Sequence, residues 1–118
     1  MEEQIIKRIL PHSAEAEQSV IGAILLDPDA IMTVSELLLP EDFYTLQYKT
    51  LYNGMLSLYQ EGKPVDPVTL QNKLREQEVP EELCSVEFIS NILSSVPTSA
   101  NVKYYAEIVK EKAVLRRL

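Results

Sequence analysis

The 118-residue sequence has one cysteine, one histidine, three glycines and no tryptophan. A single cysteine, Cys84, excludes an internal disulfide and is consistent with a reducing, cytoplasmic location. One histidine and one cysteine are too few for a His/Cys metal site. The glycines at positions 22, 54 and 62 are isolated, so the sequence holds no glycine-rich phosphate loop. We therefore expect no metal and no cofactor in this chain.

Long apolar runs are also missing. No stretch approaches the roughly 20 apolar residues that a membrane-spanning helix needs. Residues 1–10 have charges scattered through them and lack the apolar segment of a signal peptide. The composition, 46% hydrophobic and 25% charged, is ordinary for a soluble globular protein of one domain. We expect a cytoplasmic protein without a membrane partner.

Positive charge is scarce over most of the chain. The net charge is −7, and Asn101 to the C-terminus carries five basic residues against two acidic ones. The part before Asn101 therefore has a strongly negative balance, which repels phosphate backbones because Lys and Arg supply non-specific DNA binding. We expect little direct DNA binding by this domain.

Groups that could perform catalysis are poorly placed. His12 lies beside a predicted helix cap without a serine–carboxylate constellation, which favours a surface or capping role. The acidic pairs Glu2-Glu3, Glu41-Asp42 and Glu81-Glu82 lie in charged, loop-like segments, whereas catalytic carboxylate pairs need apolar pockets that shift their pKa values. We interpret these pairs as solvated faces and expect no enzymatic activity in this chain.

The first strong element is the stretch Ser13–Leu26, SAEAEQSVIGAILL. Ser13 is a good N-cap, and Ala14 to Gln18 are strong helix formers. The second half has no polar side chain, so the predicted helix belongs in a core. Gly22 costs about 1 kcal/mol against alanine in a helix, which predicts a close backbone neighbour there. The β-branched Val20 and Ile21 leave a strand as the alternative.

The rest of the chain reads as further helices without convincing period-two alternation. We expect an all-α fold, a compact bundle of about five or six helices with a longer C-terminal helix leaving it. The expected helices after the first are Asp27-Pro28 to about Leu39 (Ile31, Val34, Leu37 and Leu38 inward), Phe43 to Gly62, Asp66-Pro67 to near Gln77 (Val68, Leu70 and Leu74 inward), Ser85 to before Pro97, and Ser99 to Leu118. Asp27, Asp66 and Ser85 are the expected N-caps, and Gly62 is the expected C-cap.

An aromatic face is predicted on the helix after Phe43. Its members share one helical face and are Tyr44, Tyr48, Leu51, Tyr52, Met55 and Tyr59. Aromatic residues stack on bases in single-strand binders, but such platforms need basic neighbours and only Lys49 is available. We interpret the face as part of the core.

The last predicted helix carries two apolar stripes. One contains Val102, Tyr105, Ala106, Val109 and Ala113; the other contains Tyr104, Ile108, Leu115 and Leu118. A surface helix needs only one such stripe. The second stripe therefore predicts self-association or another partner. Residues 99–118 are treated as a helix added to a globular core of residues 1–98, whose residues 1–10 form a short N-terminal arm, all in one structural domain.

Four ordered motifs resemble the N-terminal domain of the bacterial replicative DNA helicase family (DnaB type). They are Pro11–Leu26 (PHSAEAEQSVIGAILL), Asp42-Phe43-Tyr44, Val65–Leu70 (VDPVTL) and Val96–Leu118 (VPTSANVKYYAEIVKEKAVLRRL). The resemblance implies a helical, non-catalytic domain of a hexameric helicase whose ATPase motor lies beyond a linker. It also implies that these domains pair through a helical hairpin, of which residues 99–118 form the first arm, into a collar that is a trimer of dimers.

The resemblance further implies partners. The collar receives the C-terminal domain of primase, and a helicase loader is another partner that the family allows. By position in the family pattern, the primase-facing residues correspond to Phe88, Arg116 and Leu118, with Glu82 as an addition. Many family members have two glycines where this chain has Cys84-Ser85, so the loop before Phe88 is expected to differ, and core packing is the alternative for Phe88. Two other interpretations remain: a free-standing helical adaptor, or the helicase-binding domain of a primase.

Overall fold

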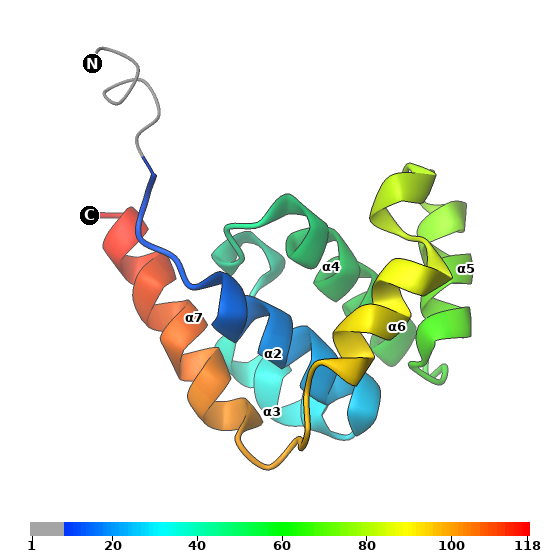
Figure 1. The fold of residues 1–118 in the computed structure, drawn as a ribbon, viewed down its shortest axis with the longest axis horizontal. Coiled ribbons are helices and arrows are strands. Elements are labelled where there is room, and N and C mark those ends of the chain that lie inside the picture. Colours follow the sequence, from blue (N-terminus) through cyan, green and yellow to red (C-terminus); the bar gives the residue numbers. More distant parts are fainter. Residues whose placement is uncertain (1–8) are drawn as a thin grey trace.

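The computed structural model describes residues 9–118, and this part of the chain forms six α-helices and two short 3₁₀ helices without a strand (Figure 1). The all-α class and the number of helices are confirmed for this part. The short N-terminal arm expected over residues 1–10 falls largely outside the described residues. The elements are α2 (Ala14–Leu26), α3 (Ala30–Leu37), η1 (Pro40–Asp42), α4 (Leu46–Gln60), α5 (Pro67–Glu76), η2 (Glu81–Leu83), α6 (Val86–Ser94) and α7 (Val102–Arg116).

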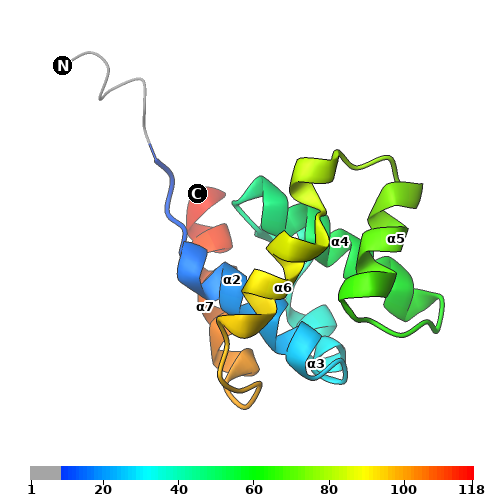
Figure 2. The same cartoon turned by 45° about the vertical axis from the view of Figure 1, so that its right-hand side comes forward.

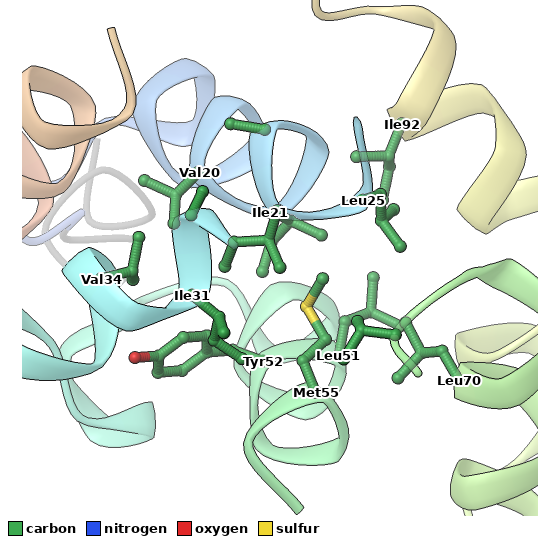
Figure 3. Packing of buried hydrophobic residues seen from close by; sticks show 14 of the residues in the cluster. Val20, Ile21, Leu25, Ile31, Val34, Leu51, Tyr52, Met55, Leu70 and Ile92 are labelled. Atoms are coloured by element: carbon green, nitrogen blue, oxygen red, sulfur yellow. The ribbon is translucent and has the colours of Figure 1, made fainter. Parts of the chain in front are cut away.

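α2 is the central helix, and it packs against α7, α6, α4 and α3 (Figures 1 and 2). Its N-cap is Ser13, as predicted: the Ala16 amide donates to Ser13 Oγ at 3.2 Å. Val20 and Ile21 are fully buried, so the core role of this helix is confirmed. Figure 3 shows side chains from α2 meeting those of α3, α4, α5 and α6 in one core.

Gly22 allows α6 to approach α2 closely. A Cβ atom built on Gly22 would lie 2.4 Å from Val96 Cγ2 and 3.0 Å from the backbone oxygen of Ile92. The predicted close approach is confirmed, and it involves both the last turn of α6 and Val96, two residues beyond its end.

Three expected details are wrong. α4 begins at Leu46 rather than at Phe43, because Phe43 is extended (φ −82°, ψ 133°) and its ring is buried. α3 begins at Ala30 rather than at Pro28, since residues 27–29 form a turn in which the Asp29 amide donates to Asp27 Oδ1 at 3.3 Å. Val68 is 70% exposed, because the first turn of α5 directs it away from the core that buries Leu70 and Leu74.

The ends of α4 and α5 follow the predicted capping chemistry. Gly62 has φ +72°, and the Lys63 amide donates to the Leu58 carbonyl at 2.9 Å, as in a Schellman C-cap. Asp66 and Thr69 form a capping box, with the Thr69 amide 2.9 Å from Asp66 Oδ1.

The core interpretation of the aromatic face is confirmed for its middle, including Tyr52, whose hydroxyl donates to the Leu38 carbonyl at 2.8 Å.

α7 lies side by side with α2 in both views (Figures 1 and 2) and also packs on α3. It has 15 residues, the same number as α4, and Ala113 near its end is 1% exposed. Among the described helices only α4 is as long, so the expected longer C-terminal helix is confirmed, and over the described residues it packs along the globule.

Candidate protein-interaction surfaces

The outer face of α7 carries an exposed apolar stripe, which we call the α7 stripe. The buried residues Val102, Ala106, Val109 and Ala113 occupy the opposite face of the helix. The spacing of the stripe places its members on one side of an α-helix, as the sequence predicted. Its members and their exposed fractions are Tyr104 (68%), Ile108 (38%) and Leu115 (42%) on α7, together with Leu118 (94%), two residues beyond the end of the helix.

A second candidate surface surrounds the start of α6. Phe88 is half-buried against the core, and its amide donates to Ser85 Oγ at 3.1 Å, which caps the helix as predicted. Glu82 in η2 is exposed. Cys84 and Ser85 stand where the family pattern has two glycines. Their φ values of −139° and −67° are negative, so the backbone at these two positions does not require glycine. Phe88 thus packs partly against the core and remains partly accessible.

Arg116 makes contacts within the chain that sequence reasoning missed. Its Nη1 donates to the Pro11 carbonyl at 2.8 Å, and its Nη2 donates to the Asp42 carbonyl at 2.6 Å. Its Cζ lies 5.3 Å from the centre of the Tyr44 ring, which also stacks on His12 with ring centres 4.2 Å apart. Arg116 therefore joins three segments of the chain that are distant in sequence.

Asp42 is not the solvated acid that its sequence context predicted. Its side chain is fully buried, whereas its neighbour Glu41 is exposed. The carboxylate accepts from the Leu39 amide at 2.8 Å and pairs with Lys110 at 3.4 Å and with Arg117. Burial raises the pKa of Asp42, but the Leu39 amide and the two basic side chains outweigh it, so the pKa lies below its usual value.

The predicted partner-binding residues form two separate groups. Phe88 lies in α6 and Glu82 in η2 just before it, whereas Arg116 and Leu118 lie at the C-terminal end of α7 and just beyond it. Figure 1 shows α6 near α5, and the C-terminal end of α7 beside the start of α2. Two hollows of about 280 and 520 Å³ lie on the α4–α5 side, and neither is lined by a predicted site residue. No helix among residues 9–118 is long and apolar enough to cross a bilayer.

Comparison with known proteins decides the family. Residues 9–111 match the DnaB-like helicase N terminal domain family. The chain belongs to this family.

Similar bacterial proteins agree with that assignment. The chain is 48% identical over 118 residues to the replicative DNA helicase DnaB of Geobacillus stearothermophilus, covering 100% of this chain and 26% of that protein. It is 47% identical over 111 residues to the replicative DNA helicase DnaC of Bacillus subtilis (strain 168), covering 94% and 24%. The crystal structure of the N-terminal domain of DnaB helicase from Mycobacterium tuberculosis matches with a TM-score of 0.89 and 43% identity, covering 93% of this chain and 76% of that one. The chain therefore spans about a quarter of the length of these helicases.

Two residues of the motif Pro11–Leu26 join α2 to other helices of this DnaB-type domain. Glu17 on α2 is 1% exposed, and its carboxylate accepts the amides of Tyr44 at 2.9 Å and Thr45 at 3.0 Å. Gln18 accepts from the Tyr48 hydroxyl at 3.2 Å and donates to Ser95 Oγ at 2.9 Å. The Glu-Gln pair thus ties α2 to the start of α4 and the end of α6.

Proposed function

We propose that this chain is the non-catalytic N-terminal domain of a hexameric replicative DNA helicase, which builds the collar of the ring and docks primase. The observation that carries the proposal is the α7 stripe in a chain of this family. A helix with apolar residues on two opposite faces covers one face with its own domain and leaves the other for a second helix. In the proposed assembly, residues 99–118 are the first arm of a dimerisation hairpin, and dimers form the hexamer.

The family match supports this interpretation over a primase domain or an unrelated adaptor. Because the chain spans about a quarter of its helicase relatives, ATP hydrolysis and unwinding are assigned to the remaining three quarters of such a protein. Primase is proposed to contact Phe88 and Glu82 on one side and the end of α7, including Arg116 and Leu118, on the other. A loader is proposed as a further partner of the same collar.

Titration of a primase C-terminal domain tests the docking part. We expect binding to a longer chain that carries both arms of the hairpin, and weaker binding to residues 1–118. Glu82→Lys should weaken binding, because Glu82 is exposed and its replacement reverses a charge without removing packing. The matched control is Glu36→Lys, an exposed glutamate on α3. Equal affinity for both variants would refute the proposed position of the primase surface.

Sedimentation of the longer chain tests the assembly part. Ile108→Ser removes an apolar residue from the α7 stripe and should weaken the dimer. Val114→Ser is the control, because Val114 is 46% exposed on the same helix but lies outside the stripe. If both variants dimerise as tightly as the parent chain, the stripe is not the self-association surface.

A further inference from the structure

A buried ionic cluster lies at the C-terminal end of α7, and of its members only Arg116 also belongs to the proposed docking surface. Three basic side chains, from this helix and the residue that follows it, contact Asp42. Lys110 and Arg117 reach the carboxylate, and Arg116 reaches the backbone carbonyl of the same residue. The end of α7 thus converges on a single residue in the connection between α3 and α4.

The cluster is asymmetric in its burial. The Asp42 side chain has no exposed surface, whereas the side chains of Lys110 and Arg117 are 41% and 48% exposed. A buried carboxylate needs its partners, because removal of one partner leaves a charge that water cannot reach. The basic side chains, which are half in water, lose much less when they leave. The carboxylate therefore favours the arrangement in which the end of α7 is seated against it.

Little apolar packing holds the final turn of α7. The last buried residue of the helix is Ala113, and Val114 and Leu115 are 46% and 42% exposed. The terminal turn is thus positioned mainly by Arg116 and Arg117, while the first three turns are held by the core face of the helix. A segment held by a few polar contacts can open locally without global unfolding.

We propose that Asp42 is the receptor of a latch, formed with Arg116 and Arg117, that fixes the final turn of α7 against the globule. Release of the latch frees the final turn while α2 to α6 and the first turns of α7 remain folded. The consequence for assembly rests on the proposed function: the latch lies where the hairpin leaves the globule, so it sets the angle between the two.

Amide hydrogen exchange of the 118-residue chain, followed residue by residue by NMR, tests the latch. Arg117→Gln removes one side of the pair but keeps the Leu39–Asp42 hydrogen bond. We expect exchange of the amides of residues 114–117 to rise roughly tenfold, as for the loss of a charge-assisted hydrogen bond, with core amides of α2 unchanged. Asp42→Asn should have the same local effect.

Lys112→Gln is the matched control, because it removes a basic residue from the same turns of α7 that is not among the partners of Asp42. The latch is overturned if Arg117→Gln leaves the final turn as protected as in the parent chain, or if the Arg117→Gln and Lys112→Gln variants exchange alike. It is also overturned if exchange rises equally in α2 and in the final turn. The experiment uses neither primase nor the dimer, so its failure is distinct from a failure of the proposed function.

Discussion

Replacement of Gly22 by alanine measures how tightly α6 is packed on α2. In an exposed helix this change is favourable, because alanine exceeds glycine by about 1 kcal/mol in helix propensity. Here the new methyl group meets Val96 Cγ2 at 2.4 Å and the Ile92 carbonyl oxygen at 3.0 Å. Both distances are too short for ordinary contact, so propensity and packing act in opposite directions.

The packing effect should win. Overfilling of a packed core costs about 1–3 kcal/mol. The upper half of that range applies, because valine is β-branched with a stiff χ1 and the second contact is a backbone atom of α6 that moves only with its helix. After subtraction of the propensity gain of about 1 kcal/mol, we expect a net loss of about 1–2 kcal/mol in the free energy of unfolding.

The chain offers a matched control in Gly54. This glycine also lies inside a helix, but a Cβ there meets Leu74 Cδ2 at 2.7 Å and Leu70 Cδ1 at 3.0 Å. Both atoms are the far ends of flexible side chains, so Gly54→Ala should stay within about 1 kcal/mol of the parent chain. Urea unfolding followed by circular dichroism gives both free energies.

The comparison of the two glycines can refute the reasoning directly. If Gly22→Ala is as stable as the parent chain, or more stable, α6 can move away without loss of stability. The close approach would then contribute nothing to the free energy of unfolding. If both variants lose the same free energy, the effect is a general one of helical glycines. Recovery in a Gly22→Ala, Val96→Ala double variant would identify the valine methyl as the source, because neighbouring sites couple.

Two further predictions concern buried carboxylates. Glu17→Ala should lower the free energy of unfolding by about 2–4 kcal/mol, because it leaves two backbone amides before α4 without an acceptor; equilibrium unfolding in urea measures it. The pKa of Asp42 is lowered in the folded state, so its ionised form stabilises the fold above its unfolded pKa of about 3.9 and this stability is lost as pH falls through the folded pKa. The stability gap between the parent chain and Asp42→Asn, measured by unfolding at a series of pH values, should therefore shrink below about pH 4.

Each of these has a control. Glu15→Ala removes an exposed glutamate from the same first turn of α2 and should have little effect. A loss equal to that of Glu17→Ala would contradict the role of the two amides. A gap between parent and Asp42→Asn that does not change with pH would show that the charge of Asp42 is unimportant.

Features set by neighbouring residues were predictable from the sequence. The Ser13, Ser85 and Asp66 caps and the Gly62 C-cap each depend on a few consecutive positions. The burial of Val20 to Leu25 and the two stripes of α7 follow from periodicity along one helix. Capping residues and apolar periodicity are both reliable in the folded chain, because each depends on the geometry of a single helix.

Features that join distant segments were not predictable in the same way. Glu17 carries a charge in a stretch of ordinary helix formers, and its amide partners lie 27 and 28 positions away. Asp42 stood in an acidic, loop-like pair, and its basic partners lie 68 and 75 positions away. Burial of a charge depends on what the rest of the chain places beside it, and the residues next to Glu17 and Asp42 in the sequence do not contain that information. The self-association and primase residues stay predictions, since they concern contacts with other chains.

The position of α2 at the centre of the fold has a consequence for synthesis. α2 ends at residue 26 and its principal neighbour α7 begins at residue 102, so the ribosome makes the apolar helix long before the helix that covers it. At roughly 5–20 residues per second, the run Val20–Leu25 waits about 4–15 s for its last partner. During this period the most apolar segment of the nascent domain lacks its principal neighbour. Glu17 and Gln18, near the start of α2, can bind the segment around the start of α4 before α7 is made.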